Sequence, residues 1–393
     1  MIFERYIYNY MHRFDQLDRL FWNYEDGCVL IGAQAMYEAT GDEYFFHSIK
    51  SFIDRYVSSA GIKYYDQTEY NIDKIPSGRV LYLLCQKTGR KEYRAAIETL
   101  MDQLRAHPRT ESGSFWHKKI YPGQIWLDGL YMGLPFYMLY ENNYGTGAGY
   151  ADVIRQFRNA RACLYNEDKK VYYHAYDEKK QMFWADRETG LSANVWSRAM
   201  GWYLMALADC YELMPAKQEE YRNELAGLWQ EAMDGMLLYQ EEKSGLFYQL
   251  TLLPEEPGNY LETSASAMVA YSLLKGSRLG VFADEVYQVR AERILLGLQT
   301  NMFFAESGKL ELGGMCVGAG LGPEDNLKRD GSIGYYLAEP VVKDEQKGVG
   351  AVMMAYSEWL KLQLSAASSG GTGGGGYPSC LGGIEVDIYN RGY

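Results

Sequence analysis

Three aspartates occupy similar positions in front of three apolar helix-forming stretches, and each could carry acid–base chemistry. Asp26, Asp73 and Asp128 each lie five or six residues before the glycine that recurs in these stretches. This spacing predicts that all three carboxyls lie at one rim of the fold. A carboxyl before a helix can instead cap its free N–H groups, so capping is the alternative for each. The neighbouring aromatic residues favour a carboxylate-lined cleft; they are Trp22, Tyr24, Tyr70 and Trp126. We expect Asp26, Trp22, Trp126 and Trp202 to contact a substrate there.

Basic residues near these acids are candidates for binding an anionic sugar. His117 and Lys118 precede Asp128 by 11 and 10 residues. Arg198 lies between two tryptophans, one of them Trp202, where stacking and bidentate anion recognition suit a guanidinium. An ion pair is the alternative for Arg198. His174 lies in a strand-like run of tyrosines, and a purely structural role is its alternative.

Composition narrows the classes of partner. The formal net charge is −12 with pI ≈ 5.1, which argues against nucleic acid or an anionic membrane as the main partner. Aromatic residues make up 15% of the chain, a content that suits both sugar binding and plain packing. The 6 cysteines have no CxxC spacing and the 5 histidines are dispersed, so we expect neither a metal nor another cofactor. The glycine-rich stretch 313–320 lacks phosphate-loop spacing and is expected to line the site as a loop.

The chain repeats one pattern of helix pairs. An apolar helix begins near Gly32, Gly78, Gly133, Gly201, Ser266 and Gly350, and a charged amphipathic helix follows most of them. A helix that is apolar all round is buried, whereas an amphipathic one covers it. We therefore predict an all-α fold, an (α/α)6 toroid whose first outer helix is residues 1–20, with short strands and long loops at one rim. An open solenoid is the competing arrangement.

The repeats end near residue 364, where the composition changes. We predict a catalytic domain at 1–364, a Gly/Ser-rich linker at 365–376 and a short tail of unknown role at 377–393. The N-terminus lacks the continuous apolar core of a signal peptide, and no stretch has the ~20 apolar residues of a membrane helix. We expect a cytoplasmic protein that contacts no membrane.

At the level of motifs, the chain resembles the unsaturated rhamnogalacturonyl hydrolases of glycoside hydrolase family 105, which are related to the unsaturated glucuronyl hydrolases of family 88. The resemblance spans about residues 20 to 362. The motifs that carry it are 126–136, 196–202, 261–268, 331–336 and 347–350. It implies that Asp128 is the general acid and that Asp73 works beside it. It also implies substrate-binding roles for basic residues at 117–118 and for His174.

The reaction implied by this resemblance acts on the 4,5-unsaturated uronic acid that a polysaccharide lyase leaves at a nonreducing end. An acid protonates C4 of the enol ether, water adds at C5, and the hemiketal opens and expels the neighbouring sugar. The acid must be protonated near neutral pH, although a helix N-terminus favours the anion. We expect burial among Trp126, Tyr131 and Trp202, with the negative charge of Asp73, to favour the protonated form.

Other functions share parts of this pattern. An epimerase or lyase would share the toroid, but we expect a His pair or a Tyr-based arrangement in those enzymes. A noncatalytic glycan-binding toroid would keep the aromatics and dispense with the paired acids. Joint presence of Asp73, Asp128 and Arg198 favours the hydrolase. The sugar on the leaving side stays open: rhamnose, another uronate, or an amino sugar. The resemblance favours unsaturated galacturonyl-rhamnose from pectin, and an unsaturated glucuronyl hydrolase acting on glycosaminoglycan or ulvan fragments is the alternative.

Overall fold

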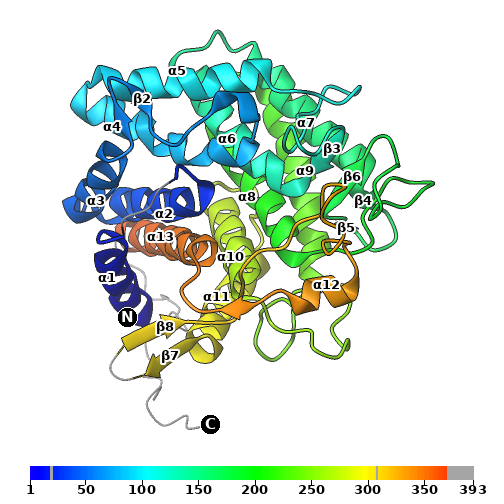
Figure 1. Ribbon diagram of the computed structural model, residues 1–393. Coiled ribbons are helices and arrows are strands. Elements are labelled where there is room, and N and C mark those ends of the chain that lie inside the picture. The colour runs from blue at the N-terminus through cyan, green and yellow to red at the C-terminus, as the bar shows by residue number, and fades with distance from the viewer. Residues whose placement is uncertain (18–20, 307–308, 370–393) are drawn as a thin grey trace.

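The computed structural model describes residues 1–17, 21–306 and 309–369 (Figure 1). Over these residues the chain forms six helical pairs. The inner elements are α2 (Tyr24–Thr40), η3 with α4 (Pro76–Arg79 and Val80–Thr88), α6 (Leu127–Asn143), α8 (Ser197–Leu213), α10 (Thr263–Arg278) and α13 (Gln346–Ser369). The outer helices are α1 (Ile2–Phe14), α3 (Glu43–Asp54), α5 (Lys91–Ala106), α7 (Gly149–Leu164), α9 (Glu219–Leu237) and α11 (Glu285–Asn301).

The inner elements form a closed ring. Each of them packs against the next in chain order, and α13 packs against α2, which joins the last inner helix to the first. The N-terminal helix α1 contacts α13 from outside. This closure confirms the predicted (α/α)6 toroid and excludes the open solenoid.

The division into inner and outer helices follows from their apolar surfaces. Helix α8 buries every residue from Ser197 to Cys210, because it is apolar nearly all round. Helix α5 buries one stripe that includes Tyr93, Ile97, Leu100 and Leu104, and its charged residues face outward.

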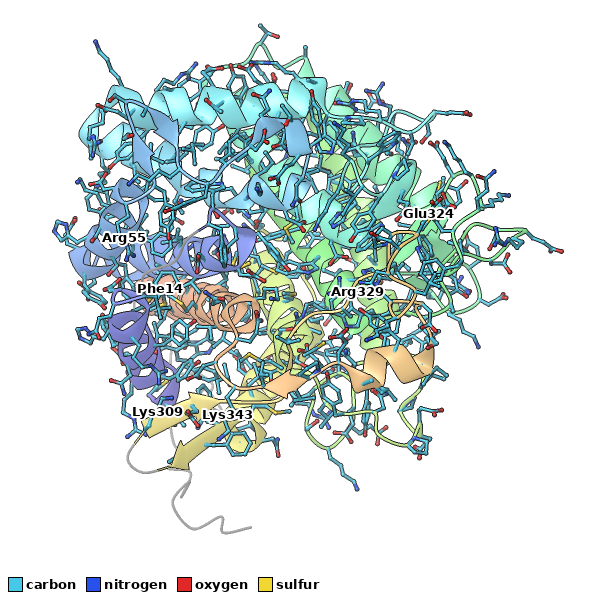
Figure 2. All side chains as sticks on the ribbon, in the orientation of Figure 1. Phe14, Arg55, Lys309, Glu324, Arg329 and Lys343 are labelled. Carbon is cyan, nitrogen blue, oxygen red and sulfur yellow. The ribbon has the colours of Figure 1, made fainter. Side chains whose placement is uncertain are left out.

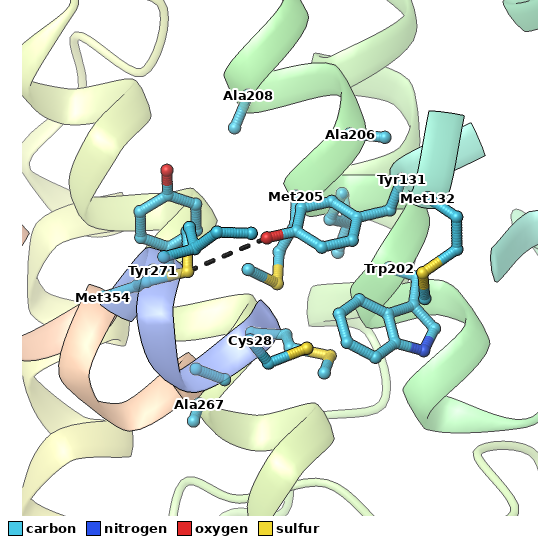
Figure 3. Close-up of a cluster of buried hydrophobic side chains, with 14 of the residues drawn as sticks. Cys28, Tyr131, Met132, Trp202, Met205, Ala206, Ala208, Ala267, Tyr271 and Met354 are labelled. Carbon is cyan, nitrogen blue, oxygen red and sulfur yellow. Dashed lines mark hydrogen bonds between the residues drawn. The ribbon is translucent and has the colours of Figure 1, made fainter. Parts of the chain in front are cut away.

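A plug of large side chains fills the middle of the ring (Figure 3). Tyr131 of α6 and Trp202 of α8 stack there, with ring centroids 4.9 Å apart. The Tyr131 hydroxyl points at the Met354 sulfur of α13, 3.8 Å away. Both aromatic rings are buried, so the plug separates the two ends of the ring axis.

Short strands lie in the loops that precede the inner helices, as predicted for one rim. They form antiparallel pairs: β1 (Val57–Ser58) with β2 (Gly61–Ile62), β3 (Gln124–Trp126) with β6 (Ala175–Asp177), β4 (Tyr165–Asn166) with β5 (Val171–Tyr172), β7 (Phe303–Glu306) with β8 (Lys309–Leu312), and β9 (Met315–Cys316) with β10 (Val341–Val342). Two short 3-10 turns, η1 (Gln67–Glu69) and η2 (Ile72–Lys74), and the short helix α12 (Ile333–Ala338) complete the loops.

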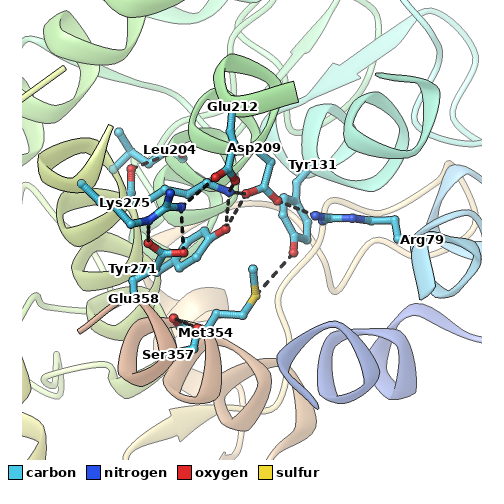
Figure 4. Close-up of polar contacts among 12 residues, drawn as sticks. Arg79, Tyr131, Leu204, Asp209, Glu212, Tyr271, Lys275, Met354, Ser357 and Glu358 are labelled. Atoms are coloured by element: carbon cyan, nitrogen blue, oxygen red, sulfur yellow. Dashed lines mark hydrogen bonds and ion pairs between the residues drawn. The ribbon is translucent and has the colours of Figure 1, made fainter. Parts of the chain in front are cut away.

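A cavity of about 170 Å³ lies beyond the plug, toward the C-terminal halves of α2, α8, α10 and α13. Its walls carry charged residues that pair with one another, among them Arg79, Asp209 and Lys275 (Figure 4). Asp26, Asp73 and Asp128 do not line it. Because its charges are internally compensated, we place the chemistry at the other end, where the strands gather.

The last inner helix, α13, runs to Ser369, so residues 365–369 are helical and the predicted start of the linker at residue 365 is wrong. The predicted tail at 377–393 lies outside the described residues. No helix within the described ranges is both long and apolar enough to cross a membrane.

Candidate active site

The loop that contains β3 delivers Trp126 and Asp128 to the start of α6. Strand β3 pairs with β6, and Trp126 stands opposite Ala175. The N–H of Leu127 donates to the carbonyl of His174 at 3.1 Å. These backbone contacts bring His174 against the first turn of α6, although more than forty residues separate it from Asp128 in the sequence.

Asp128 faces His174. The His174 Nε2 atom lies 3.1 Å from Asp128 Oδ2, but the two atoms are not aligned as a hydrogen bond. On its other side, His174 Nδ1 lies 2.7 Å from the hydroxyl of Tyr336, in α12. Burial raises the pKa of Tyr336, so its hydroxyl keeps its proton. When that hydroxyl donates to Nδ1, the ring proton is on Nε2 and faces Asp128.

Asp73 lies in the η2 turn and is held by cations. Its Oδ2 accepts from Lys118 Nζ at 2.6 Å, and its Oδ1 lies 3.5 Å from His117 Nε2. Burial works to raise the pKa of Asp73, but Lys118, His117 and Lys347 outweigh it and lower that pKa. Burial lowers the pKa of His117 to about 4. Asp73 is therefore an anion near neutral pH, beside a neutral imidazole and an ammonium group.

Trp126 joins the two acids into one cluster. Its ring stacks on His117, with centroids 4.4 Å apart and an interplanar angle of 7°. Its edge meets His174 at 5.3 Å, and Tyr121 stacks on it at 4.8 Å. Gly129 completes the fit, because a Cβ there would lie 3.2 Å from His117 Nδ1. We call Asp73, His117, Trp126, Asp128 and His174 the acid cluster.

Solvent reaches this cluster only narrowly. The side chains of Asp128 and Asp73 are 12% and 13% exposed. Both carboxyls are therefore partly desolvated. Charges interact more strongly at such a site than in water, including the charges that arise when a proton moves between a carboxyl and a bound molecule.

Helix capping, the alternative interpretation of the three acids, does not describe them. Asn23 caps α2, since its Oδ1 accepts from the N–H of Asp26 at 2.8 Å. Asn71 caps η2 in the same way, accepting from the N–H of Asp73. Trp126 occupies the N-cap position of α6. The acids are instead in the first turns of these elements.

Asp26 and Trp22 contact the frame around the acid cluster. Asp26 accepts from Gln346 at 2.6 Å, which links the starts of α2 and α13. The Trp22 indole donates to the carbonyl of Lys74 at 2.7 Å and so fixes the turn that carries Asp73. Their predicted contact with a substrate stays a prediction.

Arg198 is fully buried in an ion pair, the alternative that the sequence left open. Its guanidinium contacts Glu262 at 3.1 Å and donates to Ser264 at 2.7 Å and to the carbonyl of Cys316. One nitrogen, Nη1, has no hydrogen-bond partner among the described residues. Trp202 lies in the central plug, 2% exposed. Anion binding by Arg198 and sugar contact by Trp202 stay predictions.

Sequence reasoning did not single out two residues that the structure places around the acid cluster. Tyr336 holds His174, and Lys347 pairs with Glu25 and lies 5.4 Å from the ring of Tyr24. Tyr336 and Lys347 stand in motifs that the resemblance rests on, which was the available signal. Within the described chain, the His, Cys, Asp and Glu side chains form no group of three or more arranged to hold a metal ion.

Comparison with known proteins assigns the family. The profile of Glycosyl Hydrolase Family 88 matches residues 3–363. The chain belongs to that family. Consistent with this, a family 105 glycoside hydrolase from Clostridium acetobutylicum ATCC 824 superposes with a TM-score of 0.87 at 38% identity, over 92% of this chain and 100% of the other. The predicted resemblance to families 105 and 88 is confirmed.

Two further relatives of this family 88 chain span different shares of it. Protein Atu3128 of Agrobacterium fabrum is 40% identical over 59% of this chain and 99% of its own length. The unsaturated rhamnogalacturonyl hydrolase YesR of Bacillus subtilis is 27% identical over 66% of this chain and 72% of its own. An unsaturated glucuronyl hydrolase specific for heparin shares the fold alone, with a TM-score of 0.66 at 13% identity. The chain is thus a glycosidase of the unsaturated uronyl hydrolase group.

Proposed function

We propose that this enzyme removes a 4,5-unsaturated galacturonic acid from the nonreducing end of pectin fragments, with rhamnose as the neighbouring sugar. Asp128 is the proton donor in this proposal, and Asp73 stays ionised beside it. The oligosaccharide is the only partner that the reaction requires besides water.

The observation that carries the proposal is the contrast between the two acids. Asp73 is paired with Lys118 at 2.6 Å, and its lowered pKa suits a permanent anion. Asp128 Oδ2 has no hydrogen-bond partner in the described structure and lies 3.1 Å from His174 Nε2. Two carboxyls with different environments are the usual basis for separate acid and base roles.

The steps balance without a further reactant. Asp128 transfers its proton to C4, which leaves positive charge at C5 and the ring oxygen. Water adds its oxygen to C5 and returns a proton to the Asp128 carboxylate. The bond from C5 to the ring oxygen then opens to a ketone, and the hemiacetal at C1 releases the neighbouring sugar as an alcohol. Because no carboxylate attacks C1, the usual relation between carboxylate spacing and stereochemistry does not apply.

The choice of substrate rests on the relatives. YesR, named an unsaturated rhamnogalacturonyl hydrolase, is 27% identical to this chain, whereas the heparin-specific glucuronyl hydrolase at 13% shares only the fold. Five cysteines, Cys28, Cys85, Cys163, Cys210 and Cys316, are free thiols. Free thiols suit a reducing compartment, so we propose a cytoplasmic enzyme that acts on imported lyase products.

The test is to incubate the enzyme with unsaturated disaccharides from rhamnogalacturonan, glycosaminoglycan and ulvan lyases. We expect the ultraviolet absorbance of the conjugated double bond to fall fastest with unsaturated galacturonyl-rhamnose. In D2O, mass spectrometry and NMR should find one deuterium at C4 of the released keto sugar. Stable absorbance with all three disaccharides would refute the proposed activity, and deuterium elsewhere would refute protonation at C4.

A further inference from the structure

We propose that Arg329 recognises an anionic group on the leaving side of the substrate, so that among rhamnogalacturonan fragments the enzyme favours acidic oligosaccharides over the disaccharide with a neutral leaving sugar. This inference rests on the proposed function and adds to it a substrate class. Arg329 lies in the loop 320–332, between β9 and α12, and is labelled in Figure 2.

Hydrogen bonds and buried contacts hold the backbone of this loop next to the acid cluster. The N–H of Gly322 donates to the carbonyl of Arg329 at 2.8 Å, and the Trp184 indole donates to the carbonyl of Gly322 at 3.2 Å. Leu321 is buried in the apolar cluster that contains Trp126 and Trp184. At the far end of the loop, Asn194 donates to the carbonyl of Gly331 at 2.7 Å. The start of the Arg329 side chain is therefore held in place.

The Arg329 guanidinium lies beside the tryptophan of the acid cluster. A Cβ built on Gly320 would lie 3.2 Å from Arg329 Nη1 and 3.4 Å from Trp126 Cζ3. The space beside the Gly320 Cα is therefore bordered by both the guanidinium and the indole. The N–H of Gly320 donates to Tyr335 at 2.9 Å, next to the Tyr336 that holds His174. Absence of a side chain at Gly320 leaves the space that a guanidinium and a sugar substituent need. Gly320 ends the stretch 313–320, which the sequence predicts to line the site as a loop; residues 315–316 of it form strand β9 instead, and the lining role stays a prediction.

Arg329 differs from the other cations near the acid cluster in that no ion-pair partner is found for it among the described residues. Lys118 is paired with Asp73, Arg198 with Glu262 and Lys347 with Glu25. Throughout the described ranges, no carboxylate lies within ion-pair distance of Arg329, and its guanidinium makes no hydrogen bond.

The acids on its own loop do not supply this partner. Asp330 accepts from the N–H of Ser332 instead, and Glu324, labelled in Figure 2, and Asp325 are exposed to solvent. A half-buried guanidinium without a counter-ion is suited to bind a carboxylate or sulfate in bidentate geometry.

The position of Arg329 indicates which part of the substrate it meets. The reaction requires the unsaturated sugar at Asp128, in the least exposed part of the site. In this proposal the rest of the oligosaccharide extends toward solvent along the loop 320–332. Arg329 is more exposed than Asp128 and lies along that path, so its ligand belongs to the leaving side.

The experiment compares two substrates that differ on the leaving side. One is unsaturated galacturonyl-rhamnose, and the other is the unsaturated rhamnogalacturonan tetrasaccharide, which carries a second galacturonate. We expect Arg329→Gln to lower kcat/KM for the tetrasaccharide by about 10- to 100-fold, the effect of losing one charged partner, and to leave the disaccharide unchanged. Arg329→Lys should recover part of the loss. Lys328→Gln, at an exposed neighbour, is the matched control and should change neither value.

A sulfate group is the other source of the same chemistry. If sulfated glycosaminoglycan disaccharides gain over unsulfated ones in the wild type and lose that gain in Arg329→Gln, the anion is a sulfate ester, and the proposal holds. Equal losses on neutral and acidic substrates, or no loss on either, would overturn it. Calorimetry measures binding of the saturated tetrasaccharide to the wild type and to Arg329→Gln without requiring turnover. Equal affinities of the two proteins would refute the role of Arg329. If the enzyme turns over neither unsaturated substrate, the proposed function is refuted instead.

Discussion

The indole of Trp126 lies flat on the imidazole of His117, with centroids 4.4 Å apart, and its edge meets His174. One tryptophan thus separates two pairs of an acid with an imidazole, Asp73 with His117 and Asp128 with His174. The pairs differ in charge, because Lys118 contacts only the first. This difference in charge allows two similar carboxyls to have separate roles.

Asp128→Asn tests the proton donor. Asparagine keeps the size of aspartate but cannot donate a strongly acidic proton, so we expect turnover to fall by ~10²–10⁴. Since Asp128 Oδ2 makes no hydrogen bond in the described structure, the melting temperature should change little. Absorbance assays beside circular dichroism melts measure both. Asp325→Asn is the control, because Asp325 is an exposed acid in the loop 320–332. A folded Asp128→Asn enzyme with normal turnover would show that another group donates the proton.

Tyr336→Phe tests whether the orientation of His174 matters. The Tyr336 hydroxyl lies 2.7 Å from His174 Nδ1, and both side chains are fully buried. Removing it leaves Nδ1 without that partner and frees the ring to change tautomer. We expect kcat to fall by about tenfold or more with little change in KM, and the pH–rate profile to shift. A parallel loss in kcat and KM with an unchanged profile would indicate a packing role only.

Asp73→Asn should change the pH dependence of the reaction. The Asp73 carboxylate places a negative charge near the proton donor, and a nearby negative charge disfavours ionisation of an acid. Without it, the limit above which activity falls should move to lower pH, and turnover should drop. Because the pKa of Asp73 is lowered, Asp73 stays ionised at weakly acidic pH. Its own protonation should therefore not limit the activity of the wild-type enzyme in that pH range. An unchanged upper limit in a folded variant would contradict this coupling.

Local patterns explain what could be predicted from the sequence. The helix pairs follow from apolar periodicity, and Asp128 and Trp126 are neighbours in one short motif, so their rim position and proximity were predictable. Asp73 and Asp26 were placed at the same end by their register with the repeats. The strands at 171–177 were visible as alternation in the tyrosine run.

Contacts between distant segments explain what could not be predicted. Tyr336 reaches His174 across 162 residues, and no spacing rule connects a short helix near the C-terminus to a loop in the middle of the chain. Arg198 and Glu262 each stand in a recognisable motif, yet only the closed ring shows that they neutralise each other. That Arg329 has no ion-pair partner among the described residues is also a property of the folded loop rather than of its sequence.

The charged network at the far end of the ring should stabilise the fold without serving the reaction (Figure 4). Asp209 of α8 contacts Lys275 at 2.7 Å and Arg79 at 2.6 Å, and Glu212 contacts Lys275 at 2.6 Å. Burial works to raise the pKa of Asp209, but Lys275 and Arg79 outweigh it, and the pKa is lowered to about 2. The pKa of Glu212 is also lowered to about 2, mainly by Lys275 acting against burial.

The sign of the effect on stability follows from these shifts. Because both folded-state pKa values lie below the unfolded ones, the contribution is fully present above about pH 4–5 and is lost as the pH falls toward 2. We expect Asp209→Asn to lower the free energy of unfolding at pH 7 by about 3 kcal/mol, the lower end for a buried pair that loses one partner, because Glu212 still compensates Lys275. The variant should also flatten the acid dependence of stability, and kcat at permissive temperature should stay normal. Denaturant titrations between pH 2 and 7 measure the free energy of unfolding of both proteins.

Glu224→Gln, which breaks the exposed pair with Arg158, is the control and should lower the free energy of unfolding by at most about 1 kcal/mol. Equal losses in the two variants, or a fall in kcat with Asp209→Asn, would show that the network does not have the separate structural role assigned to it.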